Sequence, residues 1–284
     1  MNIDDITTEP LTSVAELIDL NESLEPGPLN SPARRWAFRG QPRDYGTLTP
    51  SFQRQFSRQS FGAAEVIERR LIDAFREHYD KLKDRSSDMP QPFQIGQGYD
   101  LRCLSVMQHY EIPTRLVDWT SSFWTAIYFA CASEPGSKAE LWYYDRQIFD
   151  PQRAEDPSLL GLLDRSSNPV PEPPLLSRRG ESFVVELDPQ ITPRMKEQFA
   201  HHTVSTNVFS DHAPLLFELQ QTSATNVSSP QLLRRVIIHG SCKSKALQFL
   251  AEQMNITAST VFPDVVGLGR FLRWQFESLR TMLL

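Results

Sequence analysis

The chain has 284 residues, of which 40% are hydrophobic, and its formal net charge is -6 at pH 7. This length allows one large domain or two small ones, and the apolar content is enough for a proper core. The acidic balance argues against a dedicated nucleic-acid binder, which usually carries a basic face, but it leaves room for an enzyme that contacts RNA or DNA briefly.

Signals for membranes, secretion and disulfides are missing from the sequence. No run approaches about 18 uninterrupted apolar residues, and the N-terminus lacks the apolar segment of a secretory signal. The cysteines Cys103, Cys131 and Cys242 are widely spaced and fit neither a disulfide framework nor a zinc pattern. We therefore expect a cytoplasmic protein without membrane association, in which Cys131 is a buried small hydrophobe.

The first part of the chain predicts an adaptor segment over residues 1–30 and the start of the main domain, which covers residues 31–284. The adaptor contains a short helix over residues 13–20 with Ser13 as its N-cap. The run from Ala33 to Arg39 predicts a strand that leads into Gly40. Residues 61–82 predict an amphipathic helix, whose apolar face carries Ile67, Leu71, Phe75 and Leu82.

The middle of the chain alternates between polar and apolar segments. Residues 100–110 predict a helix that Pro113 ends, because proline excludes the helical conformation from the residue before it. Residues 114–119 predict a short strand, and Thr120, Ser121 or Ser122 can cap the apolar helix expected over residues 123–132. A strand over 141–144 precedes a proline-rich excursion over residues 145–180, a loop length that is usually functional or disordered.

The last third predicts strands over residues 183–187, 215–219 and 233–238. Helices are expected over residues 243–254 and from Asp264, as the N-cap, to about residue 279. The separated helices and strands lack the regular βαβ rhythm of a doubly wound fold, so they indicate a mixed α+β or α/β domain.

Arg39 is the first candidate site residue, because it stands within an apolar run that Gly40 and Gln41 close. A guanidinium offers five donors in a fixed fork and suits pyrophosphate or carboxylate recognition. Gly40 would let a ligand or a backbone approach closely. The alternative is a structural pairing of Arg39 with Asp118 or Glu186.

The second candidate is the polar stretch from Gln108 to Thr120, which directly precedes the buried helix and suggests the wall of a site. The density of polar groups in this stretch favours a functional role for His109 and Asp118. The alternatives are structural, because a lone histidine is more often structural and Asp118 can cap the next helix or hold Arg115. The three histidines near Asp211 match no strong ligand spacing, so we expect no metal. Glycine-rich phosphate loops, zinc-protease motifs and nucleophile elbows are absent from the sequence.

Three segments carry a family resemblance: Phe38-Arg39-Gly40-Gln41, the run from Gln108 to Thr120, and Phe262-Pro263-Asp264. In these segments the chain resembles the FRG-domain family, which is named for a Phe-Arg-Gly tripeptide. The second segment departs from the family at Glu111, where glycine is usual, and at Val117. The resemblance extends from about Trp36 to Phe271.

The layout of this family is in turn similar to that of the ADP-ribosyltransferases, and it implies an α+β fold: one domain with a central split or mixed sheet flanked by helices. In those enzymes one strand supplies an arginine or histidine that holds NAD, and a second supplies an aromatic or hydroxyl residue followed by an apolar helix. A third strand supplies a catalytic glutamate. The resemblance implies that NAD, as substrate, is bound by Arg39, Gly40, Gln41, Thr114, Arg115, Trp119, Thr120 and Ser121.

The same resemblance implies catalytic roles for His109, Tyr110, Asp118, Glu186 and Glu218. Tyr110 or Trp119 would stack on the nicotinamide, and Glu186, Glu218 and Asp118 are alternatives for the carboxylate that stabilises the oxocarbenium-like centre. A segment with a glutamine, matched here by Gln198, has no assigned role.

The implied function is that of a bacterial toxin or phage-defence effector that modifies RNA, DNA or protein, with an antitoxin or regulatory protein as a candidate partner. Two alternatives stay open. One is a metal-dependent or His/Asp hydrolase or nuclease that uses His109 and Asp118. The other is a non-catalytic module in which Arg39 and Arg115 hold an anionic ligand or a partner.

Overall fold

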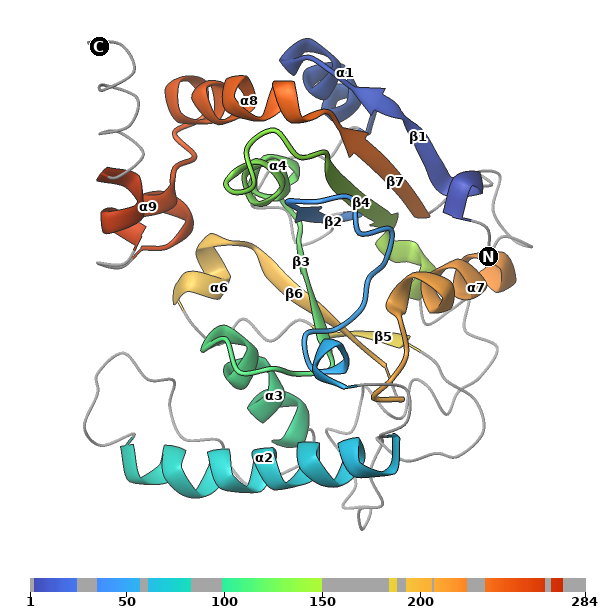
Figure 1. Cartoon of the computed structure of the whole chain (residues 1–284), viewed down its shortest axis with the longest axis vertical. Coiled ribbons are helices and arrows are strands. Elements are labelled where there is room, and N and C mark those ends of the chain that lie inside the picture. The colour runs from blue at the N-terminus through green and yellow to red at the C-terminus, as the bar shows by residue number, and fades with distance from the viewer. Residues whose placement is uncertain are drawn as a thin grey trace.

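The computed structural model describes residues 3–24, 35–56, 61–82, 99–149, 184–187, 193–205, 207–223, 233–263 and 267–272. These residues build one seven-stranded sheet in the order β1-β7-β4-β2-β3-β6-β5 (Figure 1). Only β1 and β7 are parallel neighbours, so the fold is α+β with a mixed sheet. The strands are β1 (Thr7–Leu11), β2 (Trp36–Gln41), β3 (Leu116–Thr120), β4 (Ala139–Asp145), β5 (Val184–Leu187), β6 (Ala200–Ser205) and β7 (Leu233–Ile238).

The sheet is weakly joined at its centre, between β2 and β3. These two strands share a single register pair, Phe38 with Thr120, whereas β2 pairs with β4 from Trp36 to Gln41. β3 likewise pairs with β6 along its whole length. We call the unpaired space beyond the Phe38–Thr120 pair the β2–β3 opening.

Helices cover both faces of the sheet, and alternate residues of each strand decide which face they meet. On one face α1 (Val14–Leu24), α4 (Phe123–Cys131) and α8 (Gly240–Gln253) pack over β2, β4 and β7. On the same face α3 (Tyr99–His109) packs on β3, with α2 (Phe61–Leu82) beside it, and α6 (Pro193–Glu197) and α9 (Ala258–Val261) complete this layer. α7 (His212–Ser223) packs on the opposite face. No helix in the described part of the chain is both long and apolar enough to cross a membrane.

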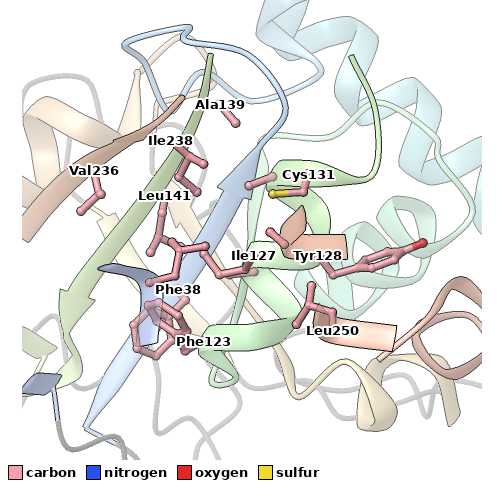
Figure 2. Close-up of a cluster of buried hydrophobic side chains, with 14 of the residues drawn as sticks. Phe38, Phe123, Ile127, Tyr128, Cys131, Ala139, Leu141, Val236, Ile238 and Leu250 are labelled. Carbon is pink, nitrogen blue, oxygen red and sulfur yellow. The ribbon is translucent and has the colours of Figure 1, made fainter. Parts of the chain in front are cut away.

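The main core lies between α4, α8 and the central strands. Phe38, Leu141 and Val236 from three strands belong to one cluster with Ile127 of α4 and Leu250 of α8, and Figure 2 shows Phe38 and Leu141 beside Ile127. α4 begins where predicted, with the Ser122 side chain accepting a hydrogen bond from the Thr125 N–H at 3.2 Å. All three cysteines are buried and free, which confirms the expectation for Cys131.

The N-terminal residues belong to the same body as the rest of the fold. Ser13 caps α1 by accepting a bond from the Glu16 N–H, and Glu16 accepts one back from the Ser13 N–H, which is a capping box. α1 then buries Leu17 completely in the main core. The strand β1, which was not predicted from the sequence, adds to the edge of the sheet beside β7.

The predicted strand over residues 215–219 is wrong, because these residues lie in α7. Ala213, Leu216 and Gln220 are buried, and their spacing of three and four residues is that of one helix face. The short apolar run Leu215–Phe217 suggested a strand, but packing on the sheet selected the helix. The strand β6 was also unpredicted.

The helix over residues 61–82 is confirmed as α2, although its buried face is turned from the predicted one. Ile67 is 38% exposed, whereas Ala64, Glu68 and Ile72 are buried. Glu68 turns inward because it pairs with the buried Arg115. Of the excursion predicted over residues 145–180, Asp145 ends β4 and Arg146–Phe149 form a short 3-10 helix. Residues 150–180 and most of the helix expected from Asp264 lie outside the described residues.

Candidate functional site

A cavity of about 250 Å³ lies beside the β2–β3 opening, and we call it the first cavity. Residues far apart in the sequence meet here, from β2, α3, β3, α4, α6 and β6. Among the described residues that line it, Asp118 is the one carboxylate, beside two arginines and two histidines. The lining consists of Phe38, Arg39, Gly40, Gln108, His109, Asp118, Trp119, Thr120, Phe129, Arg194, Met195, Gln198, Ala200 and His202.

Arg39 bridges the β2–β3 opening. Its Nη1 donates a hydrogen bond to the backbone carbonyl of Asp118 at 2.8 Å, where a strand pair would otherwise continue. Its Nε is buried and has no hydrogen-bond partner within the described part of the chain. Burial lowers the pKa of Arg39, and the Asp118 charge offsets part of this, but a guanidinium stays protonated. A buried donor without a partner costs roughly 1–3 kcal/mol, so an acceptor at this position would be favoured.

Asp118 presents its carboxylate to the first cavity, with a polar side chain near each oxygen. Oδ2 accepts a hydrogen bond from Gln108 Nε2 at 2.8 Å, and Oδ1 lies 3.0 Å from His202 Nδ1. The side chain is 50% exposed although it lies deep in the molecule, because its open half faces the cavity. Burial raises the pKa of Asp118, but its hydrogen bonds and the charges of His202 and Arg39 outweigh burial and lower the pKa overall.

The orientation of Gln108 is set from behind by Thr114. The Thr114 hydroxyl accepts a hydrogen bond from the Leu116 N–H at 3.1 Å and donates its own proton to Gln108 Oε1 at 2.6 Å. Because the amide oxygen of Gln108 is occupied in this way, its NH₂ group points at Asp118. Thr114 thus acts on the first cavity without lining it.

His202 connects Asp118 to Ser105, whose Oγ lies 3.0 Å from His202 Nε2. The chain of contacts from serine through histidine to aspartate resembles an acyl-transfer triad. In such a triad the serine faces the substrate, whereas here the aspartate faces the cavity. Ser105 is 1% exposed and does not line the cavity, whereas the aspartate at the other end does. This chain therefore orients a carboxylate and does not present a serine nucleophile.

Six of the predicted site residues line the first cavity: Arg39, Gly40, His109, Asp118, Trp119 and Thr120. Gly40 is required by the fold, since a Cβ atom there would lie 1.9 Å from the Ala126 carbonyl oxygen of α4. The Trp119 ring is turned to the opposite face, where its Nε1 donates to Thr203 Oγ1 at 2.9 Å. A buried ring in that position does not stack on a ligand in the cavity.

Other predicted binding residues have structural partners outside the cavity. Gln41 donates to the Glu140 carboxylate at 2.7 Å, and Arg115 forms a buried pair with Glu68. The structural alternative for Arg39 holds in part, because Arg39 bonds the backbone carbonyl of Asp118. The Ser121 N–H donates to the Phe199 carbonyl.

Two of the three candidate carboxylates lie away from the first cavity. Glu186 is on the opposite face of the sheet, where it accepts bonds from the Tyr144 hydroxyl at 3.1 Å and from Arg146 Nε at 2.8 Å. Glu218 is exposed on α7. Tyr110 is 45% exposed and contacts the His109 ring edge-on.

His202, Arg194, Met195 and Gln198 had no predicted role in the site. All four come from α6, β6 and the turn between them, and β6 has too few apolar residues to show the alternation of a strand. Its sequence Ala200-His201-His202-Thr203-Val204-Ser205 suggested at most a metal site. Among the described residues, no group of three or more His, Cys, Asp and Glu side chains is arranged to hold a metal.

Comparison with known proteins identifies one family. The FRG domain family model matches residues 34–139, a segment that contains β2, α2, α3, β3 and α4. That segment supplies nine of the cavity-lining residues, from Phe38 to Phe129, and the α6–β6 region supplies the rest. No curated protein and no solved structure matches the chain.

Proposed function

Residues 34–139 carry an FRG domain, and we propose that its cavity binds NAD and that the protein is an ADP-ribosyltransferase. The reaction would release nicotinamide and transfer ADP-ribose to a macromolecule. One observation carries the proposal: the first cavity holds an arginine with an unfilled buried donor, Arg39, beside a single ionised carboxylate, Asp118.

The arrangement of these groups supports the proposal because it follows the layout implied by the family resemblance. β2 supplies Arg39-Gly40, and the neighbouring β3 ends in Trp119-Thr120-Ser121 directly before the apolar α4. The layout departs from a standard transferase at its third element. Neither Glu186 nor Glu218 lines the first cavity, so Asp118 takes the role of the catalytic carboxylate.

The chemistry requires a negative charge next to the ribose carbon C1′. As the bond between C1′ and the nicotinamide nitrogen breaks, its electron pair leaves with nicotinamide, and positive charge develops on the ribose. The Asp118 carboxylate stabilises that charge until the acceptor's nucleophilic atom bonds to C1′ and loses its proton to Asp118 or to water. Arg39 binds the diphosphate or the nicotinamide ribose.

The hydrolase alternative has weaker support in the geometry. His109 lines the first cavity, but it is His202 that contacts Asp118, and the serine at the end of that chain is buried. A non-catalytic anion-binding module remains the second candidate, because Arg39 and Arg194 would also hold an anionic ligand without turnover.

The decisive experiment compares Asp118→Asn with wild type in a nicotinamide-release assay, using labelled NAD with and without cell lysate. The substitution keeps the shape and removes the charge, so we expect release to fall by roughly 100- to 1,000-fold while the protein stays folded. Glu186→Gln is the matched control, since it neutralises a carboxylate on the opposite face. NAD binding by folded wild-type protein without any nicotinamide release would favour the binding module.

The biological role proposed with this activity is that of a toxin or phage-defence effector in the cytoplasm. Its acceptor is RNA, DNA or protein, and labelled product from the lysate assay identifies the class. Expression of wild-type protein should slow bacterial growth, whereas Asp118→Asn at the same protein level should not. Equal growth inhibition by both would separate toxicity from the cavity.

A further inference from the structure

A second cavity, of about 680 Å³, adjoins the first one, and the two share Gly40 and Phe129 in their walls. Its lining is mainly apolar and aromatic, in contrast to the polar lining of the first cavity. Tyr128 and Phe129 come from α4, Ala251 comes from α8, and Phe262 and Phe271 come from the C-terminal part of the chain.

Two arginines meet at Phe262, near the junction of the two cavities. Arg194 lines the first cavity, and its guanidinium carbon lies 4.3 Å from the centre of the Phe262 ring. Arg270 lines the second cavity, and its guanidinium carbon lies 4.6 Å from the same ring centre. Both guanidinium groups therefore contact one ring, one from each cavity, and this pair of positive charges favours an anion with more than one negative charge.

The size of the first cavity limits what it can hold. Ligand sites usually measure about 300–1,000 Å³, so a cavity of about 250 Å³ accommodates only part of a dinucleotide. The remainder must extend into neighbouring space, and the second cavity adjoins the first one and has sufficient volume. Its aromatic walls suit the flat face of a purine.

We propose that the second cavity binds the adenosine half of a dinucleotide, while Arg194 and Arg270 hold the diphosphate at the junction with the first cavity. This inference rests on the proposed function for the identity of the other half, the nicotinamide riboside beside Asp118. It assigns substrate contacts to α8 and to residues 262–271, which lie outside the matched FRG segment.

The test uses two probes that each represent one half of NAD: ADP for the second cavity and nicotinamide mononucleotide for the first. Binding is measured by calorimetry on the full chain. Ala251→Trp places a large ring in the second cavity, and Arg270→Ala removes one guanidinium. Lys245→Trp is the matched control, because Lys245 is exposed on the same helix and does not line the cavity.

We expect Arg270→Ala to weaken ADP binding roughly tenfold or more and Ala251→Trp to abolish it, with nicotinamide mononucleotide binding unchanged. Lys245→Trp should bind both probes as wild type does. ADP binding that is equal in wild type and Ala251→Trp overturns the adenosine site, even if nicotinamide release is intact. ADP binding that is lost in Ala251→Trp supports the site, even if no nicotinamide is released and the transfer activity itself fails.

Discussion

Thr114 controls the carboxylate of Asp118 through Gln108, although it never reaches the first cavity. Thr114→Val keeps the shape of the side chain and removes its hydroxyl. The Gln108 amide then loses the bond that fixes its orientation, and the Leu116 N–H loses its acceptor. Because the Gln108 bond helps lower the pKa of Asp118, we expect that pKa to rise.

The measurement is the acid limb of the pH profile of nicotinamide release, which should move to higher pH in Thr114→Val. Thr203→Val is the control, since Thr203 is also a buried threonine with side-chain hydrogen bonds, but on the opposite face. Both variants should lose roughly 1–3 kcal/mol of stability, and only Thr114→Val should move the acid limb. If the acid limb of the pH profile is the same in Thr114→Val as in wild type, Gln108 keeps its orientation without the Thr114 hydroxyl.

The buried His212 should make the free energy of unfolding depend on pH in the acidic range. It is completely buried, its Nδ1 lies 2.8 Å from Thr203 Oγ1, and burial together with the Arg39 charge lowers its pKa to about 3. Between that value and about 6.5, its ordinary pKa, the unfolded chain binds a proton that the folded protein does not. The free energy of unfolding therefore falls as pH falls through this window, by up to about 1.4 kcal/mol per pH unit.

Urea unfolding of His212→Gln between pH 4 and 6.5 should show a shallower dependence on pH than that of wild type. His239→Gln is the control, because His239 is exposed at the start of α8. Equal slopes for wild type and His212→Gln would mean that His212 is not neutral in the folded protein.

At the scale of elements, the close contact between α4 and β2 depends on Gly40, which has no side chain. A Cβ atom at Gly40 would lie 1.9 Å from the Ala126 carbonyl oxygen and 2.6 Å from the Ala130 nitrogen, and both are backbone atoms of α4. Gly40→Ala must push the helix off the strand. We expect a loss of roughly 1–3 kcal/mol or more in a thermal or chemical unfolding experiment.

The same substitution should weaken substrate binding, because Gly40 belongs to the walls of both cavities. Gly269→Ala is the control, since a Cβ atom there meets nothing within 4 Å and the residue lies in a helical segment. It should be neutral or slightly stabilising. A Gly40→Ala protein as stable as wild type would contradict the close packing of α4 on β2.

The elements that could be predicted from sequence are those whose local pattern agrees with their final packing. α2 and β7 have the predicted bounds, and α4 has its predicted cap, because periodicity, length and capping residues all point the same way. The strand β6 was missed since its buried residues are largely histidine, threonine and serine, whose side chains contact partners on α3, α7, β3 and β5. α7 was misassigned because a short apolar run suits either type of element.

The candidate site could be predicted only in part for the same reason. Arg39 and Asp118 stand in recognisable local motifs and were identified. His202 and Arg194 enter the first cavity because β6 pairs with β3 and α6 precedes it, and such long-range pairing leaves no mark in a local pattern. Trp119 was predicted to belong to the site because it stands in a local motif. Its ring nevertheless points away from the cavity, because alternate residues of a strand face opposite sides of the sheet.

At the scale of the whole molecule, the N-terminal segment, predicted as an adaptor, is built into the sheet and the core. β1 pairs with β7, the Leu11 carbonyl accepts from the His239 N–H at 2.8 Å, and the Leu24 carbonyl accepts from Trp36 Nε1 at 2.8 Å. Deleting residues 1–24 would remove these bonds, uncover the main core beneath Leu17 and expose the edge of β7.

We expect the deletion to lower the melting temperature strongly and to cause association through the exposed strand edge, measured by thermal unfolding and light scattering. Leu17→Ala tests the core contribution alone and should cost roughly 2–5 kcal/mol, whereas Asp19→Ala, on the exposed side of α1, should be near neutral. A separable adaptor predicts the opposite result, a truncated protein that melts as wild type does and stays monomeric. Since the edge strand and α1 cover the same core that holds α4 against Gly40, the truncated protein should also lose substrate binding.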